Sequence, residues 1–560
     1  MNSDFLLCKE HILSEEYVDI QLTSPMTFDS ATCIQPINEQ YSIAYVPKSS
    51  FNRLDYSYSN FPLPFGLMDA LALESSGIIK TFNQPTLGLT GKGVLIGFID
   101  TGIDYLHPSF LNNDGTTRIH SIWDQSIQTG IPPEGFLYGS EYTREEINEA
   151  IWSENPRQLV PSIDENGHGT YIAGVAAGRN GAAPDAILSI VKLKPAKKFF
   201  KDYYLIKDDS IVYQENDIMT GVNYLIRLQA KLNLPLVICI GLGSNMGSHT
   251  GCCFLQAYLE SLGKSYQTAV VIAAGNEANA SHHFEGKIEN VGDYEDVEIL
   301  VGEDEQQLGF VTELWSDLPQ IYTVGFTSPT GEVIEPLTMV SGRNYQLNFI
   351  LDDTKIDLFY DLINDSGGSQ VIRMRFITPN QGLWKIRVYN LYQIGGIYDL
   401  WLPNRGFISD ETRFLEPDSF TTITTPSNSA SVITVAAYNH RTNSIFIDSG
   451  RGNSRRGLIK PTLSAPGVNI LGPLANSTSY QTRTGTSASA AIVAGAVCSL
   501  FEWAITKDNL PTITGTLIQF YLIAGVRTNP LLSYPNRDWG YGTLDLYHIF
   551  EVLRTLPIVN

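Results

Sequence analysis

Residues 93–100 read GVLIGFID, a continuous apolar run that ends in the acidic residue Asp100. Such a run is typical of a strand that is buried on both faces in a parallel sheet. Helix-like segments, such as DIMTGVNYLIRLQAKL (217–232), separate it from similar runs. Strands that alternate with helices predict an α/β fold of three layers, with a parallel sheet covered by helices on both faces. The further runs are AILSIVKLK (186–194), PLVICIGLG (235–243), AVVIAAGN (269–276) and SVITVAAYN (431–439).

A second pattern occupies residues 285–430, where many short segments alternate between apolar and polar residues. In QVIRMRFITP (370–379), for example, we expect the apolar side chains to point inward and Arg373 and Arg375 to point outward. Short strands of period two, separated by turn residues, predict an antiparallel sandwich or jelly roll. Because the apolar runs resume at residue 431, this all-β domain is expected to be an insertion in the α/β domain.

The first 65 residues mix short strand-like pieces with acidic and polar stretches, which predicts a small N-terminal α+β domain. Its last part, DYSYSNFPLPF (55–65), has the composition of a linker, and a helix is expected over GLMDALALESSGI (66–78). The expected domains are therefore residues 1–65, the first part of the α/β domain at 66–284, the insertion at 285–430, and the second part of the α/β domain at 431–560.

The composition excludes several classes of partner. The 560 residues include 59 acidic and 37 basic side chains, for a net charge of −22, and 43% are hydrophobic, enough for a large core. The absence of a Lys/Arg-rich run argues against binding to nucleic acid or to anionic membranes. The first residues, MNSDFLLCKEHILSEEY, lack the pattern of a secretory signal, and we expect no membrane-spanning run. The simplest interpretation is synthesis in the cytoplasm, with the six cysteines reduced and several of them buried.

A candidate nucleophile lies near the C-terminus. Gly485-Thr486-Ser487 is followed by the small, apolar, helix-forming run ASAAIVAGAVCSLF. A serine at the start of a helix lies at the positive end of the helix dipole, beside backbone N–H groups that have no partner within the helix. An oxyanion formed there would be stabilised. Taken alone, the motif is equally consistent with an ordinary N-cap, so the interpretation depends on the rest of the chain.

Three upstream residues complete a catalytic set. Asp100 ends a predicted parallel strand, His168 lies between glycines in NGHGTYIAG, and Asn276 ends the strand AVVIAAGN. A general base must reach the hydroxyl and be held by a carboxylate, and a side-chain amide can donate to an oxyanion. Asp-Thr-Gly is also the motif of aspartic proteases, but that mechanism needs two such carboxylates and the motif occurs once here. The order Asp, His, Ser is one of the known arrangements of a serine-protease triad.

These motifs resemble those of the subtilisin-like serine proteases, the subtilases. The matching segments are FIDTGID around Asp100, NGHGTYIAG around His168, AAGNE around Asn276, GTSASA around Ser487, and the lesser motif KPTLSAPGVNI at 460–470. The resemblance covers about half of the chain and implies a serine endopeptidase that needs no cofactor. The sequence departs from the family pattern at Tyr171, where a second histidine is usual, and after the nucleophile, where Met-Ala-x-Pro-His is usual.

The resemblance implies a role for each matching residue. Asp100 would orient His168, which would take the proton of Ser487 and give it to the leaving amine. Asn276, with the backbone N–H of Ser487, would hold the oxyanion. Extended substrates would pair with the strand at Gly241, Leu242 and Gly243, and Ala273, Ala274 and Gly275 would line the first specificity pocket together with Gly243. No metal site is expected, although His282-His283 raises the possibility of one.

The layout as a whole looks like that of the clostridial Csp germination proteases, because of its prodomain without a signal peptide, its FGLMDALALESSGI entry and its insertion ahead of Ser487. This narrower resemblance implies a spore-associated protein that removes its own prodomain, to which it can stay bound, and that activates a cortex-lytic proenzyme. Some members of that group have lost triad residues and act as pseudoproteases. The alternative is therefore a silent scaffold, plugged by its prodomain, that acts in germination signalling or binding; the complete triad favours an active enzyme.

Overall fold

The computed structural model describes residues 3–23, 31–52, 56–67, 75–251, 253–363, 367–391 and 394–555. Its central feature is a mixed sheet of nine strands in the order β25-β24-β12-β10-β5-β8-β6-β7, with β26 also paired to β24. All of the apolar runs predicted as parallel strands lie in this sheet, and the pairs from β6 to β26 are parallel, whereas β7 and β25 are antiparallel edges. The strands are β5 (Leu95–Asp100), β6 (Ile119–Asp124), β7 (Ser140–Thr143), β8 (Ile187–Lys192), β10 (Leu236–Ile240), β12 (Thr268–Ala273), β24 (Ile433–Asn439), β25 (Ser444–Ile445) and β26 (Leu463–Pro466).

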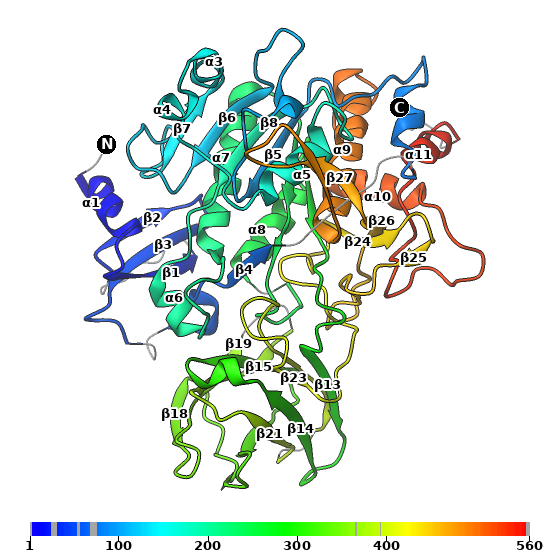
Figure 1. Cartoon of the computed structure of the whole chain (residues 1–560). Helices are drawn as coiled ribbons and strands as arrows, with labels where there is room; N and C mark the ends of the chain where they lie inside the picture. Colours follow the sequence, from blue (N-terminus) through cyan, green and yellow to red (C-terminus); the bar gives the residue numbers. More distant parts are fainter. Residues whose placement is uncertain are drawn as a thin grey trace.

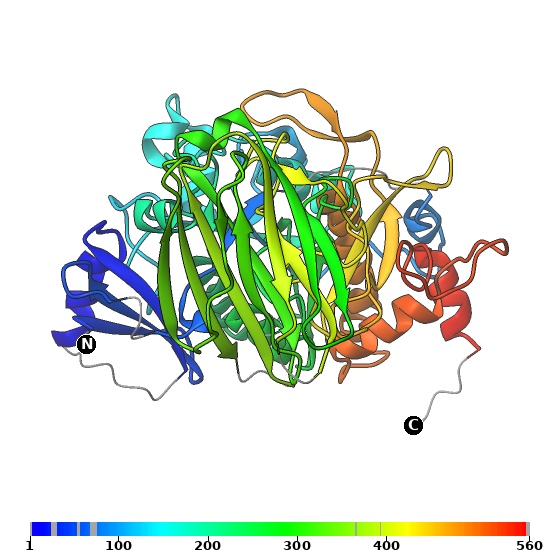
Figure 2. The ribbon, with the colours of Figure 1, turned by 90° about the horizontal axis from the view of Figure 1, so that it is seen from below.

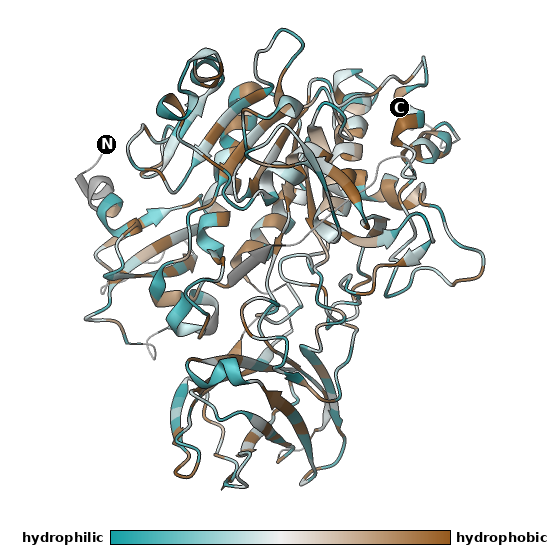
Figure 3. Cartoon of the chain, viewed as in Figure 1, coloured by the Kyte–Doolittle hydropathy of each residue, from teal (hydrophilic) through white to brown (hydrophobic). Residues whose placement is uncertain are grey.

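Helices cover both faces of this sheet (Figure 1), which confirms the three-layer α/β prediction. On β5, Ile96 and Phe98 belong to a core shared with α5 (His168–Ala177) and α9 (Thr486–Phe501). The alternate residues of β5, Leu95 and Ile99, belong to a second core shared with α7 (Glu215–Leu232) and α8 (Phe254–Gly263). Successive side chains of β5 therefore pack into two different cores, one on each face of the sheet. The apolar residues concentrate in the central strands and in the helices packed on them (Figure 3).

Helix α9 is the described helix that most resembles a membrane span. Together with the π-helical turn that follows, it forms a helix over Thr486–Thr506 that is long and apolar enough to cross a membrane by length and composition alone. However, 89% of its most apolar stretch is buried inside the protein. All residues from Thr486 to Phe501 are buried, and the approach is so close that a Cβ on Gly495 would lie 2.4 Å from the Cβ of Ala182. The run is therefore the central core helix of the α/β layers.

The N-terminal residues form a helix and an antiparallel sheet in the order β1-β3-β2, which lies against α6 (Lys198–Tyr203) and α7 (Figure 1). Val18 and Ile43 from this sheet share the second core with Met219 of α7. Cys8 and Cys33 form a disulfide, so the expectation of reduced cysteines is wrong for this pair, whereas Cys239 and Cys498 are free and buried. The elements are α1 (Ser3–Ile12), β1 (Tyr17–Thr23), β2 (Cys33–Pro36) and β3 (Tyr41–Pro47).

The segment after this unit forms a strand where a linker was predicted. Strand β4 (Pro64–Leu67) lies between β11 (Leu242–Gly243) and β9 (Tyr213–Gln214), antiparallel to both. The helix expected over 66–78 begins on this strand, and most of it falls on residues 68–74, outside the described residues. The other elements of the α/β part are α2 (Ile78–Phe82), α3 (Arg144–Trp152), α4 (Pro156–Leu159), β27 (Ile470–Pro473), β28 (Tyr480–Arg483), α10 (Gly515–Ala524) and α11 (Leu546–Leu553).

Two antiparallel sheets lie between residues 283 and 414 and pack face to face (Figure 2) around a core of their own. The predicted alternation holds on β20, where Ile372, Met374 and Phe376 are buried in this core. Arg373 is an exception, because the outer face of β20 is covered by the rest of the molecule and the guanidinium forms a buried ion pair with Glu313 at 2.8 Å. One sheet comprises β13 (His283–Ile288), β22 (Gly396–Trp401), β15 (Gly309–Asp317), β20 (Ser369–Ile377), β19 (Lys355–Ile363) and β18 (Arg343–Asn348); the other comprises β17 (Val333–Ile334), β16 (Thr323–Thr327), β21 (Gly382–Tyr389), β14 (Tyr294–Val301) and β23 (Arg413–Phe414).

Candidate active site

The candidate site lies at the carboxyl edge of the nine-stranded sheet, where the strand order reverses. Strand β5 has β8 on one side and β10 on the other; after β8 the chain crosses to the opposite side of β5 and continues outward through β10, β12 and β24. Ligands bind at such switch points because the loops that leave neighbouring strands diverge there. Asp100 is the last residue of β5, and Gly241 directly follows β10.

Asp100 and His168 form a buried pair. The Nδ1 of His168 lies 2.7 Å from Oδ1 of Asp100, and the two side chains are 2% and 0% exposed. The same carboxylate oxygen accepts a hydrogen bond from the backbone N–H of Thr101 at 2.8 Å. A carboxylate can only accept here, so Nδ1 of His168 carries the proton. In the neutral imidazole, Nε2 is then the basic nitrogen.

A second buried carboxylate, Asp164, anchors the helix that carries His168. It accepts hydrogen bonds from the backbone N–H groups of Gly167 and Thr170, both at 2.8 Å. It also accepts the hydroxyl protons of Thr170 at 2.6 Å and of Thr101 at 2.7 Å. An anion at a helix N-terminus satisfies unpaired N–H groups and interacts favourably with the dipole. Sequence reasoning missed Asp164, although an acid four residues before the histidine could have indicated a helix start.

Ser487 lies in the first turn of α9, as predicted from its motif. The turn starts at Gly485, whose φ of 151° is unfavourable for other residues. The Ser487 hydroxyl is buried and donates to the carbonyl of Gly241 at 3.3 Å. The serine is thus held at the carboxyl edge of the sheet by the residue that follows β10.

Gly241 is the point at which the three predicted catalytic residues meet. A Cβ on this glycine would lie 2.9 Å from Cε1 of His168, 3.3 Å from Oδ2 of Asp100 and 3.3 Å from Cβ of Ser487. The structure therefore brings together Asp100, His168 and Ser487, from β5, α5 and α9, within reach of one backbone position. Only glycine fits there without displacing the imidazole.

Asn276 is fixed beside the same helix start. Its Oδ1 accepts from the backbone N–H of Thr486 at 3.0 Å and from the Thr486 hydroxyl at 3.1 Å. That hydroxyl oxygen in turn accepts from the N–H of Gly275 at 3.1 Å. Because the carbonyl half of the amide is anchored on Thr486, the Nδ2 protons are directed away from it. This arrangement can supply a donor to an oxyanion at the start of α9.

The predicted substrate-binding residues lie on two neighbouring segments. Gly241, Leu242 and Gly243 follow β10, and residues 242–243 form β11; Ala273 ends β12, and Ala274 and Gly275 follow it. Both segments are supported by one stretch of chain that sequence reasoning did not find. The N–H of Thr424 donates to Ala274 at 3.0 Å, and Thr425 exchanges backbone hydrogen bonds with Ser244 at 2.9 Å.

Two other side chains that could act as a nucleophile or as a metal ligand are Cys239 and His283. Burial, and secondarily Asp100, raises the pKa of the Cys239 thiol, so it stays protonated. His283 lies between Oδ1 of Asp399 at 3.0 Å and the carbonyl of Asp418 at 3.2 Å. Among the residues that the structure describes, no group of three or more His, Cys, Asp or Glu side chains is arranged to hold a metal ion.

A mixed parallel sheet with an Asp-His pair and a helix-borne serine at its carboxyl edge defines the class of subtilisin-like serine proteases. A model of the subtilase family, peptidase family S8, matches residues 91–309 and 408–541, which is more than half of the chain. The chain therefore belongs to the subtilase family.

One solved structure resembles nearly the whole chain. The CspB protease of Clostridium perfringens is 33% identical, with a TM-score of 0.76, and the alignment covers 86% of this chain and 99% of that one. The subtilisin-like protease SBT2.2 of Arabidopsis thaliana is 33% identical over 102 residues, which are 17% of this chain and 12% of that protein. The subtilisin of Bacillus sp. strain TA39 is 27% identical over 227 residues, 38% of this chain and 42% of that protein. The chain thus aligns with less than half of the length of each of these two curated relatives.

Proposed function

We propose that the protein is a serine endopeptidase in which Ser487 is the nucleophile, His168 the general base and Asp100 its orienting carboxylate. The observation that carries the proposal is the meeting of the three side chains around Gly241. In this mechanism the Ser487 hydroxyl turns from the Gly241 carbonyl toward Nε2 of His168, which takes its proton as the oxygen attacks the peptide carbonyl. The imidazolium then protonates the leaving amine, and water hydrolyses the acyl-enzyme by the same route.

The developing oxyanion would be held by Nδ2 of Asn276 and the backbone N–H of Ser487. The anchoring of the Asn276 carbonyl on Thr486 supports this assignment, because it sets the orientation of the amide before substrate arrives. We further propose that Gly241, Leu242 and Gly243 pair with the substrate backbone, and that Ala273, Ala274 and Gly275 line the pocket for the residue before the cut.

The N-terminal unit, residues 1–65, would be a prodomain that the enzyme removes from itself. The pairing of β4 with β11 supports this proposal, since Gly66 lies opposite Gly243 and Leu67 opposite Leu242 in an antiparallel register. The chain thus approaches the site as an added strand, which is how extended peptides bind sheet edges. Gly241, the residue before Leu242, accepts the Ser487 hydroxyl proton. We therefore expect the cut within one or two residues after Leu67.

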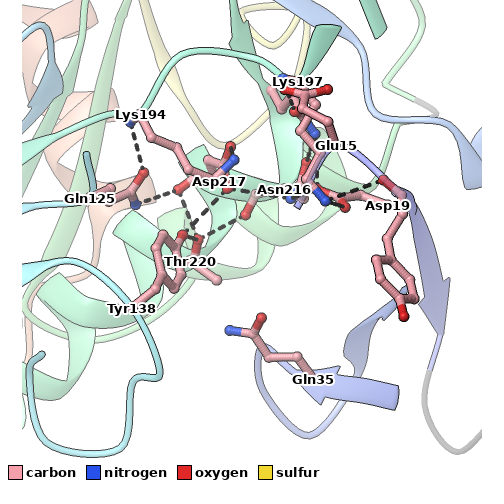
Figure 4. A network of polar contacts seen from close by, with 12 residues as sticks. Glu15, Asp19, Gln35, Gln125, Tyr138, Lys194, Lys197, Asn216, Asp217 and Thr220 are labelled. Carbon is pink, nitrogen blue, oxygen red and sulfur yellow. Dashed lines mark hydrogen bonds and ion pairs between the residues drawn. The ribbon is translucent and has the colours of Figure 1, made fainter. Parts of the chain in front are cut away.

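A buried polar network supports the proposal that the cleaved prodomain stays bound (Figure 4). Asp19 of β1 forms an ion pair with Lys197, and both side chains are at most 3% exposed. Gln214 and Asn216 also donate to the Asp19 carboxylate, at 3.1 and 3.3 Å. Burial lowers the pKa of Lys197 below its ordinary value, and the Asp19 carboxylate partly opposes this shift. Lys197 also donates to the carbonyl of His11 at 3.1 Å, so departure of the N-terminal unit would break all of these contacts at once.

The two sheets between residues 283 and 414 would form the inserted jelly-roll domain that was predicted at 285–430. The likeness to the CspB protease over nearly all of that chain supports a role of the same kind as the germination proteases that the motifs resemble. On this proposal the substrate is a spore cortex-lytic proenzyme, the partner is the protein's own prodomain, and the protein, made in the cytoplasm, is spore-associated.

Reaction with a serine-directed fluorophosphonate probe tests the chemistry. Wild type is expected to label with one probe per chain, and Ser487→Ala and His168→Ala are expected to lose the labelling. The matched control is Ser489→Ala, two residues along the same helix, whose hydroxyl donates to the carbonyls of Ala465 and Pro466 and which is expected to label. Absence of labelling in wild type that has lost residues 1–67 would favour the silent scaffold.

A further inference from the structure

The loop that follows β11, residues 244–250, lies against the six-stranded sheet and the segment that leaves it. Side chains of Asn404, Glu313 and Trp401 each contact this loop or the strand before it. Asn404 follows β22, Glu313 is in β15 and Trp401 ends β22. The part of the chain that contains the two antiparallel sheets, residues 283–414, is called the β-domain below. It is in direct contact with β11, on which the proposed substrate would lie.

Asn404 makes the most specific of these contacts. Its Oδ1 accepts from the backbone N–H of Asn245 at 2.8 Å, and its Nδ2 donates to the carbonyl of Gly243 at 3.0 Å. The side chain is buried, so neither bond is exchanged freely with water. The carbonyl of Gly243 and the N–H of Asn245 are thus bonded by one side-chain amide, in the way that a neighbouring strand would bond them. It therefore fixes the path of the backbone from Gly243 to Asn245.

These two hydrogen bonds of Asn404, called the clamp below, are linked to the segment that carries Asn276. The side-chain amide of Asn245 donates to Oε2 of Glu277 at 3.0 Å, and Glu277 directly follows Asn276. The same carboxylate oxygen accepts from the backbone N–H of Arg405 at 3.3 Å. Residues 404 and 405 thus join the substrate-facing strand to the loop that carries the oxyanion donor.

Two further contacts hold the end of the loop. Oε2 of Glu313 accepts from the N–H of Gly247 at 3.2 Å, while its other oxygen is bound by Arg373 at 2.8 Å. The ring of Trp401 stacks on His249 with centroids 4.1 Å apart and planes within 8°. All of these groups are buried, so the loop is held along its length by a rigid surface.

We propose that Asn404 is a positioning residue for extended substrates, which holds β11 in the geometry that a substrate strand needs for pairing; the inference rests on the proposed protease function of the site. It gives the β-domain a direct part in substrate recognition. Loss of the clamp weakens the interactions of those substrate residues that pair with β11. The reacting groups, which are anchored on β5, α5 and α9, are left in place.

Hydrolysis of substrates of two lengths tests this role in processed enzyme. For Asn404→Ala, we expect kcat/KM to fall about five- to tenfold for a peptide with four residues before the cut, and by less than about twofold for p-nitrophenyl acetate, which does not pair with β11. Asn404→Asp places an oxygen against the Gly243 carbonyl and is expected to lose at least as much. Equal losses on both substrates, or none on either, would contradict the proposal. The control is Asn390→Ala, which removes a buried amide bonded to Asn290 at 3.1 Å and is expected to leave the ratio of the two activities unchanged.

A second measurement does not depend on catalysis. In a Ser487→Ala background, hydrogen exchange of the peptide covering residues 242–250 is expected to speed up in Asn404→Ala but not in Asn390→Ala. Unchanged exchange overturns the clamp even if wild type is an active protease. Faster exchange together with an inactive wild type keeps the clamp and shows instead that the protease function is wrong.

Discussion

The carboxylate of Asp164 accepts the hydroxyl proton of Thr101 at 2.7 Å, and so ties the end of β5 to the start of α5. Asp100 directly precedes Thr101, and His168 begins α5. The distance between the proposed base and its orienting carboxylate is thus fixed by a second, buried acid that takes no part in the chemistry.

We predict that Asp164→Asn lowers kcat/KM by about 10²-fold, mostly through kcat, because the amide cannot accept all four hydrogen bonds and the imidazole shifts. Steady-state kinetics on a peptide substrate measures this. The control Asp185→Asn removes an exposed carboxylate just before the start of β8, at the opposite edge of the sheet from the site. It is expected to leave kcat and KM unchanged. A normal kcat in Asp164→Asn would show that the helix start holds its position without this acid.

Gly241→Ala is predicted to lower kcat by at least about 10²-fold, since its Cβ would lie 2.9 Å from Cε1 of His168 and the ring must move. The rate of fluorophosphonate labelling measures the effect independently of substrate binding. Gly221→Ala is the matched variant: it adds a methyl group in α7 at no less than 3.1 Å from its neighbours. Labelling of Gly241→Ala at the wild-type rate would refute the meeting of the triad at this position.

Asp19→Asn is predicted to release the N-terminal fragment after cleavage. Removing one partner of a buried ion pair costs about 3–5 kcal/mol, because Lys197 is left buried without its carboxylate. Size-exclusion chromatography of the processed protein would show the fragment eluting separately. Glu15→Gln is the control, since this exposed carboxylate accepts from the backbone N–H of Lys198 and is not part of the buried ion pair. The double variant Asp19→Asn/Lys197→Met is expected to recover part of the binding; if it does not, the charge pair is not what holds the fragment.

Lys460 gives the stability a predicted pH dependence. It is fully buried, its Nζ donates to the carbonyl of Val432 at 2.8 Å, and burial lowers its pKa to about 7. The unfolded chain, with an ordinary lysine pKa of about 10.4, then binds more protons between the two values, so stability rises with pH from about 7 to about 10. Urea unfolding of Lys460→Met across this range is expected to show a flatter slope than wild type. An identical slope would show that Lys460 is charged in the folded state.

The sequence identifies those features that local chemistry determines. Asp100, His168, Asn276 and Ser487 were each predicted from the residues around them, and the apolar runs predicted the central sheet. Contacts between distant segments could not be predicted in this way. Asn404 reaches Asn245 across 159 residues, and the burial of Arg373 depends on what packs over β20. The disulfide of Cys8 and Cys33 likewise depends on α1 folding onto its sheet.

The central claim, that Ser487 is a nucleophile within reach of the strand that ends at Leu67, is tested most directly by N-terminal sequencing of purified wild type beside Ser487→Ala. Wild type is predicted to yield a second N-terminus within one or two residues after Leu67, and Ser487→Ala is predicted to remain intact at 560 residues. The same new N-terminus in both proteins, or none in either, would contradict the account.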